Sequence, residues 1–208
     1  MTTGLKLDHL VVTAPDLASG AAHVEKTLGV ELSAVGTHAF MGTHNRLLSL
    51  GLGLYLEVIA IDPNGNTPPH PRWFNMDNRE PNIILSNWAC RTKDLESALK
   101  DAPTGTGQPR RFNRGRYTWQ MALPDTGRLP FDDIAPALLQ WETGGHPTEL
   151  LPDVGCRLIK LEVRHPDATL LGQRKFDSKS LDLVDFVESE DIGLVATILT
   201  PTGEKRLS

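Results

Sequence analysis

A β-α-β-β-β order of elements that occurs twice constrains the fold of this chain more than any other feature of its sequence. In the first copy, β-branched residues close a predicted strand over residues 5–13, and Asp16 then supplies a carboxylate that suits a helix N-cap. Apolar residues at helical spacing follow over residues 17–28, and Gly29 stands where the end of a helix favours a positive φ. We expect the three remaining strands of this copy at residues 31–35, 45–50 and 54–61.

The second copy follows a long loop at residues 62–81 that is rich in proline, asparagine and glycine. A short strand is expected at residues 87–91, and Asp94 caps a predicted helix over residues 95–100. The further strands of this copy are expected at residues 111–116, 117–123 and 136–141. When the two caps are superimposed, His9 lies over Asn87, although few residues are identical.

The C-terminal quarter of the chain looks like half of another such unit. Residues 157–164 alternate between apolar and polar side chains, which is typical of a strand with one buried face. A short helix at 169–175, strands at 181–188 and 193–199, and a terminal turn at Pro201 and Gly203 complete this expectation. We therefore predict one α+β unit over residues 1–208, with a first βαβββ module at 5–62, a second at 85–150, and a β-rich half-module at 155–207 that completes the sheet.

Composition and charge narrow the classes of function. Of the 208 residues, 39% are hydrophobic and 23% are charged, which is the balance of a globular protein. The net charge of −5 disfavours non-specific binding to nucleic acid. Four arginines lie close together and either clamp an anion or, as we favour, belong to a solvated loop: Arg110, Arg111, Arg114 and Arg116.

Cysteine usage and segment patterns favour a cytoplasmic protein. The two cysteines, Cys90 and Cys156, form no CxxC pair and are few for a secreted scaffold. No segment reads as a signal peptide or as an apolar span, so no membrane partner is expected. Motifs of serine hydrolases, kinases and zinc proteases are missing as well.

Several short motifs are scattered over most of the chain: Leu7-Asp8-His9-Leu10-Val11-Val12, Pro15-Asp16-Leu17, Leu28-Gly29-Val30, His38, Gly42-Thr43-His44-Asn45-Arg46-Leu47, Tyr55-Leu56-Glu57, Trp119, Gln140-Trp141 and His146-Pro147. With these motifs the chain resembles the vicinal oxygen chelate proteins, the superfamily of glyoxalase I, extradiol dioxygenases and bleomycin-resistance proteins, and within it a glyoxalase-like family of bacterial proteins. It implies paired βαβββ modules that form a curved mixed sheet around a cup.

The resemblance also implies where a site would lie. In metal enzymes of the superfamily, the ligands come from the first and fourth strands of each module, and His9 and Glu57 match these positions in the first module. In the second module Asn87 takes the place of a histidine, and either Gln140 or Glu142 takes the fourth-strand position. Because asparagine and glutamine are poor ligands for transition metals, we expect no tightly bound metal, and at most a weakly held divalent ion on His9 and Glu57.

Further candidates for ligand binding are Asn45, Arg114, Trp88, Trp119 and Trp141, together with Gln140 and Glu142. For Asn45 the alternative is a tight turn, and for the tryptophans it is core packing. His146, in a loop with two glycines, is expected to be exposed.

Three functions remain open. The first is a lyase-, isomerase- or dioxygenase-like enzyme in which His9 and Glu57 act on a small oxygenated molecule. The second is a non-enzymatic small-molecule binding protein, and the third is an interaction module with a vestigial cup. A homodimer is compatible with each of them.

Overall fold

A computed structural model of the protein describes residues 4–51, 53–173, 180 and 182–208. The first βαβββ unit consists of β1 (Lys6–Thr13), α1 (Leu17–Leu28), β2 (Gly36–His38), β3 (Thr43–Ser49) and β4 (Tyr55–Ile61). The second consists of β5 (Ile84–Arg91), α2 (Leu95–Lys100), β6 (Gln108–Arg114), β7 (Tyr117–Leu123) and β8 (Ala137–Thr143). The short 3-10 helices η1 (Trp73–Asn75) and η2 (Pro147–Glu149) lie in the connecting loops.

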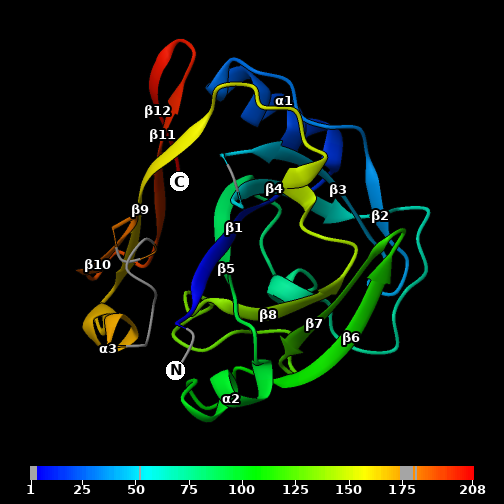
Figure 1. Cartoon of the computed structure of the whole chain (residues 1–208), viewed down its shortest axis with the longest axis vertical. Helices are drawn as coiled ribbons and strands as arrows, with labels where there is room; N and C mark the ends of the chain where they lie inside the picture. Colours follow the sequence, from blue (N-terminus) through cyan, green and yellow to red (C-terminus); the bar gives the residue numbers. More distant parts are fainter. Residues whose placement is uncertain (1–3, 52, 174–179, 181) are drawn as a thin grey trace.

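The strands of the two units build one mixed, eight-stranded sheet in the order β2-β3-β4-β1-β5-β8-β7-β6. In each unit the first strand pairs in parallel with the fourth, β1 with β4 and β5 with β8. The sheet curves so strongly that its outer strands approach each other and enclose a cup (Figure 1). The predicted fold class is therefore confirmed.

An approximate twofold axis passes between β1 and β5, which pair antiparallel at the centre of the sheet. Leu10 pairs with Trp88 across this axis, His9 pairs with Ala89, and Val11 pairs with Asn87. Residues 78 apart in the sequence are equivalent under this axis, so that His9 corresponds to Asn87 and Val11 to Ala89. The pair His9–Ala89 is therefore equivalent to the pair Asn87–Val11. The register that places His9 over Asn87 in the sequence also holds in three dimensions.

Both helix N-caps form as expected. The carboxylate of Asp16 accepts a hydrogen bond of 2.8 Å from the backbone N–H of Ser19, and that of Asp94 accepts one of 2.9 Å from Ser97. Helix α1 ends at Gly29, whose φ of 71° lies in the left-handed region that glycine adopts at low cost. An aspartate cap just before the apolar residues therefore determines where each helix begins.

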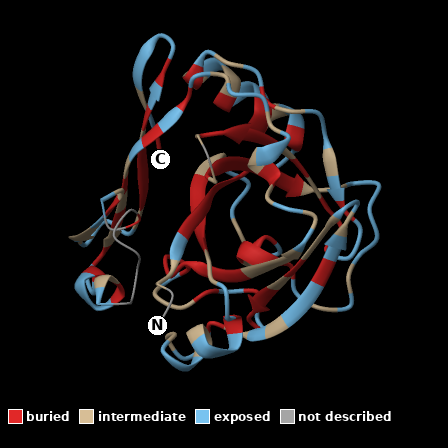
Figure 2. Ribbon diagram, in the orientation of Figure 1, coloured by how far each residue is buried: buried red, intermediate tan, exposed pale blue. Residues whose placement is uncertain are grey.

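The convex face of the sheet carries the main hydrophobic core. Helix α1 covers β3 and β4, while α2 lies against β7 and β8. Figure 2 shows buried residues concentrated along the central strands and exposed residues mainly in the loops. A second apolar cluster, which includes Val11, Ile59 and Trp119, lines the concave face and forms the floor of the cup.

The C-terminal segment differs from the prediction that it completes the sheet. It forms a separate four-stranded sheet, β10-β9-β11-β12, that packs on the convex side near β5 and α1. Its elements are β9 (Arg157–His165), α3 (Ala168–Gly172), β10 (Val184–Glu188), β11 (Gly193–Thr200) and β12 (Gly203–Leu207). Leu158, Leu161 and Val163 of β9 are buried in the core that the two layers share, whereas Ile159 is exposed.

One smaller prediction was also wrong, and one strand was missed. Residues 31–35 form no strand, and β2 begins only at Gly36. The terminal turn at Pro201 and Gly203 leads into β12, which the sequence did not predict. Residues 174 and 175 of the expected C-terminal helix and residue 181 of the expected strand lie outside the described residues. No helix in the described ranges is long and apolar enough to cross a lipid bilayer.

Candidate functional site

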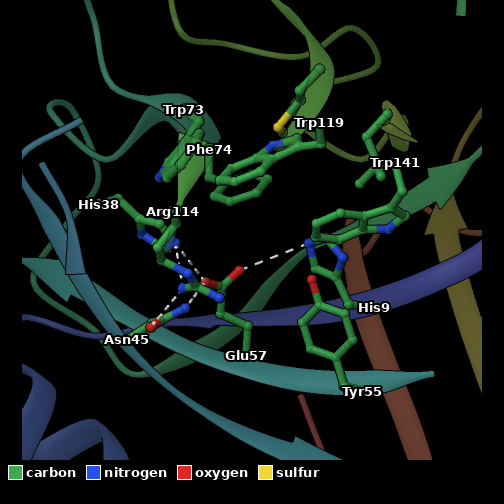
Figure 3. A pocket seen from close by; sticks show the side chains of 12 residues that line it. His9, His38, Asn45, Tyr55, Glu57, Trp73, Phe74, Arg114, Trp119 and Trp141 are labelled. Carbon is green, nitrogen blue, oxygen red and sulfur yellow. Dashed lines mark hydrogen bonds and ion pairs between the residues drawn. The ribbon is translucent and has the colours of Figure 1, made fainter. Parts of the chain in front are cut away.

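A small cavity opens in the cup, and most of its polar lining comes from the first module (Figure 3). The space, counted out to its open mouth, is about 420 Å³. The polar part of the wall consists of His9, His38, Asn45, Tyr55, Glu57 and Arg114. The apolar part consists of Trp73, Phe74, Trp119, Met121, Leu139 and Trp141.

A β-bulge at Asp8 shapes the first polar group of the cavity. Leu7 pairs with Cys90 and His9 pairs with Ala89, so Asp8 is an extra residue in β1 relative to β5. Leu7 therefore faces the convex core while His9 faces the cup, although a regular strand would place both on one face. The bulge also brings Asp8 beside His9, and His9 Nδ1 lies 2.7 Å from Asp8 Oδ1.

Asp8 is fully buried and accepts hydrogen bonds from four side chains. Besides His9, the donors are Arg91 Nη1 at 3.0 Å, Trp141 Nε1 at 3.0 Å and His146 Nε2 at 3.1 Å. Burial alone would raise the pKa of Asp8, but the hydrogen bonds from His146 and His9 outweigh it and hold the pKa well below its ordinary value. Asp8 is therefore an ionised carboxylate behind the cavity wall.

Glu57 lies at the centre of the cavity between two imidazoles. Its Oε2 is 3.8 Å from His9 Nε2 and its Oε1 is 4.0 Å from His38 Nε2. Asn45 Nδ2 donates a hydrogen bond of 2.5 Å to Glu57 Oε1. The side chain of Glu57 is almost completely buried, so this amide hydrogen bond and the two imidazoles replace most of its hydration.

Arg114, at the end of β6, joins the far edge of the sheet to the first module. Its Nη1 donates to His38 Nε2 at 2.9 Å and to Asn45 Oδ1 at 3.2 Å. His38 is neutral, because burial and the charge of Arg114 hold its pKa well below the ordinary value. Figure 3 shows His38 and Arg114 on one side of Glu57 and His9 on the other.

Tyr55 completes the polar wall beneath His9. The two rings stack with their centroids 4.6 Å apart. Burial, together with the charges of Asp8 and Glu57, raises the pKa of Tyr55 well above its ordinary value, so the phenol keeps its proton. Among the described residues none accepts a hydrogen bond from this hydroxyl, which leaves it available to a ligand.

The second module offers no equivalent set of polar groups among the described residues. Asn87, the counterpart of His9, is fully buried, where it accepts a hydrogen bond from Arg79 and donates one to the carbonyl of Asp133. Val11 pairs with Glu57 in the first module, and Ala89 pairs with Ala137 in the second, so the counterpart of Glu57 is Ala137.

The expectation that Gln140 or Glu142 faces the cup is therefore wrong. Their neighbours Leu139 and Trp141 line the cavity, and the alternation of a strand turns Gln140 and Glu142 outward. Gln140 accepts a hydrogen bond from the backbone N–H of Leu95 at the start of α2, and Glu142 bonds to Arg111 and Gln120.

The other candidates divide between the two faces. Trp119 and Trp141 line the cavity, whereas Trp88 is buried in the convex core and donates to the carbonyl of Ile134. The basic cluster divides in the same way: Arg114 enters the cup, but Arg111 is exposed and pairs with Glu142.

The sequence predicted that His146 is exposed in a loop, but its side chain is hydrogen-bonded to Asp8. Its Nδ1 accepts from the backbone N–H of Thr148, so its Nε2 carries the hydrogen that is donated to Asp8. The motifs that carried the resemblance contained Asp8, His38, Tyr55 and His146, but sequence reasoning assigned none of them to the site. A carboxylate beside a histidine on one strand was the available signal, but alternation predicts opposite faces unless a bulge intervenes.

The donor set does not fit the metal site that the resemblance implies. Only His9 and Glu57 remain of the four positions, because Asn87 is engaged by Arg79 and Ala137 has no donor. The structure brings together no group of three or more histidine, cysteine, aspartate or glutamate side chains, within its described ranges, that is placed to hold a metal ion. We therefore derive no step through a metal.

Comparison with known proteins gives the family. Residues 7–175 match the glyoxalase-like domain. A hypothetical protein from Staphylococcus aureus superimposes with a TM-score of 0.52 at 16% identity, covering 97% of this chain and 85% of that one. Methylmalonyl-CoA epimerase from Mycobacterium tuberculosis aligns with a TM-score of 0.43 at 19% identity, covering 69% and 90%. No curated protein matches the sequence. The chain belongs to the glyoxalase-like domain family.

Proposed function

We propose that the protein binds a small oxygenated molecule in the cup and transfers a proton on it, with His9 as the base. The observation that carries this proposal is the orientation of the imidazole. Asp8 is ionised and can only accept, so the hydrogen between the two side chains belongs to His9 Nδ1. The lone pair of a neutral His9 is then on Nε2, which faces the cavity.

The surroundings of Nε2 favour such a role. Glu57 Oε2 is 3.8 Å away, beyond hydrogen-bond distance, so a ligand group has room to approach the nitrogen. When His9 accepts a proton, Asp8 stabilises the imidazolium that forms. A positioned base of this kind contributes roughly 10²–10⁴-fold to a proton transfer.

Glu57 and Tyr55 supply the complementary groups. The carboxylate of Glu57, 3.8 Å from His9 Nε2, can stabilise the imidazolium that forms, and this imidazolium can return its proton to another position of the ligand. The phenol O–H of Tyr55 can donate to a ligand oxygen. This combination suits removal and return of a proton on a carbon next to a carbonyl, an isomerase- or lyase-like reaction.

A specific observation supports a second candidate, a protein that binds its ligand without reaction. Four aromatic side chains, Trp73, Phe74, Trp119 and Trp141, form much of the cavity wall, which suits stacking against an apolar ligand. The cytoplasmic location and the homodimer expected from the sequence stay predictions.

Hydrogen exchange tests the proposal across a panel of compounds, so the substrate need not be identified first. Chelator-treated protein is incubated in D₂O with small 2-oxo and 2-hydroxy compounds, and loss of the C–H signal is followed by proton NMR. We expect exchange with the unmodified protein, a loss of at least about a hundredfold in His9→Gln, and unchanged exchange in the outward-facing control Glu142→Gln. Binding without exchange supports the second candidate, whereas neither binding nor exchange overturns the proposal.

A further inference from the structure

We propose that the molecule taken up by the cup is a small organic acid with one negative charge, whose carboxylate is bound by Arg114. This inference rests on the proposed function, because it names the class of ligand for the same cavity. It follows from the pairing of Arg114, from the space around it and from the charge already present beside it.

Arg114 differs from the other arginines around the cup in its partners. Its two hydrogen-bond partners, His38 Nε2 and Asn45 Oδ1, are neutral acceptors, and no carboxylate of the described residues lies within 4.0 Å of its nitrogens. In contrast, Arg91 contacts Asp8 at 3.0 Å and Arg79 contacts Asp133 at 3.8 Å. A partly buried cation without a counter-charge is costly, so an anion is the ligand that this wall favours.

The guanidinium is held in place but still has donors to offer. Both contacts use Nη1, and no described residue accepts from Nε or Nη2. His38 is fixed in turn, because its Nδ1 lies 3.1 Å from the hydroxyl of Thr43. An oriented guanidinium edge with free N–H groups matches the two oxygens of a carboxylate.

Gly36 on β2 leaves the space that this arrangement needs. A Cβ at this position would lie 2.6 Å from Asn45 Oδ1 and 3.3 Å from Arg114 Nη1. Any larger residue therefore displaces the two side chains that orient the guanidinium. The glycine makes a substitution available that disturbs Arg114 without removing its charge.

The charge balance favours a monoanion over phosphate. Glu57 lies in the same cavity and is linked to Arg114 through Asn45, so a dianion would meet one cation and one carboxylate. With its carboxylate at Arg114, a small acid extends past Glu57 toward His9 (Figure 3). The aromatic wall then contacts its apolar substituent.

Calorimetric titration of the full chain tests the inference with matched probes. The probes are 2-hydroxy and 2-oxo acids with methyl, isopropyl and phenyl substituents, the neutral amide of each acid, and inorganic phosphate. We expect binding by at least one acid, none by its amide, and none by phosphate. Arg114→Gln should weaken the acid by at least about tenfold, Arg114→Lys and Gly36→Ala by less, and the exposed control Arg111→Gln should leave it unchanged.

The outcomes separate this inference from the proposed function. If the amides bind as well as the acids, or if Arg114→Gln binds the acids normally, the carboxylate assignment is overturned while proton transfer by His9 is unaffected. Binding of phosphate alone, or of no acid at all, also overturns it. If acids bind and depend on Arg114 but neither His9→Gln nor Glu57→Gln alters affinity or exchange, the inference holds and the proposed function fails. Thermal unfolding of each variant verifies that it is folded.

Discussion

The two halves of the cup occupy equivalent places around the central strand pair, and their chemistry diverges at each equivalent position. Both β1 and β5 carry a bulge, at Asp8 in the first module and at Ser86 in the second. Next to the bulge stand His9 in one strand and Asn87 in the other, and the fourth strands contribute Glu57 and Ala137. The backbone is therefore repeated, while the ionisable groups of the cavity wall, apart from Arg114 on β6, come from one half.

The difference teaches how a duplicated fold can support an asymmetric site. In the second half, Arg79 and the carbonyl of Asp133 satisfy Asn87, so this part of the cup is closed by its own loops. The strands of that half contribute Met121, Leu139 and Trp119 to the cavity wall. One module thus provides most of the polar groups, and the other provides an apolar wall that limits their contact with water.

The largest effect is expected where the halves differ in buried charge. Asp8→Asn removes the carboxylate that Arg91, His9 and His146 share, and it leaves the guanidinium without its counter-charge. We expect a loss of about 3–5 kcal/mol in the free energy of unfolding, measured by urea denaturation. The matched change in the other bulge, Ser86→Ala, should cost about 1 kcal/mol or less. Equal losses for both variants would contradict the comparison.

Exchanging the residues beside the bulges should give the next largest effect. Asn87→His breaks the hydrogen bonds to Arg79 and Asp133 in a fully buried position, so we expect a loss of about 1–3 kcal/mol in the free energy of unfolding. His9→Asn, which places the second module's residue in the first, should lower stability less but abolish exchange of the ligand C–H. The comparison fails if His9→Asn is the more destabilising change.

A smaller effect is expected from pH. Because the pKa of His38 is lowered in the folded protein, the unfolded chain takes up a proton below about pH 6.5 that the folded protein does not. Stability should therefore fall as pH decreases below that value, by up to about 1.4 kcal/mol per pH unit from this group. Urea denaturation of the unmodified protein and of His38→Gln at several pH values isolates this contribution. Parallel curves for the two proteins would show that His38 does not stay neutral.

The smallest effect is expected when the protein is dialysed to remove metal. With Asn87 and Ala137 at two of the four ligand positions, protein purified without chelator and then dialysed should retain no stoichiometric zinc, iron, nickel or manganese. Elemental analysis of the dialysed protein measures this directly. Retention of one equivalent of metal that is lost in Glu57→Gln would show that the first module suffices for binding.

The sequence predicts the fold further than it predicts the site. Capping residues and helical spacing are local signals, so α1 and α2 appear at the expected residues. The separate C-terminal sheet depends on tertiary pairing, which alternation within β9 does not reveal. His9 and Glu57 share the cup, as the resemblance implies.

What the sequence could not provide was the register of β8 and the bulge in β1. Gln140 and Glu142 were assigned to the cup in place of Ala137, which lies three and five residues before them. Each of these offsets is odd, and an odd offset along a strand moves a side chain to the other face. In a regular strand the consecutive residues Asp8 and His9 would face opposite sides of the sheet. The bulge instead brings their side chains together. Arg114 lies in an arginine-rich stretch. It shares the inner face of β6 with Phe112, two residues before it, whereas alternation turns Arg111 outward.

A crystal structure with the tightest-binding acid of the calorimetric panel tests the central claim most directly, because it locates the ligand in one half of the cup or elsewhere. The account predicts a carboxylate on Arg114, the adjacent carbon facing His9 Nε2, and Asn87 still bonded to Arg79. A ligand in the second half that displaces Arg79 from Asn87, or one bound outside the cup beside Gln140, would contradict it.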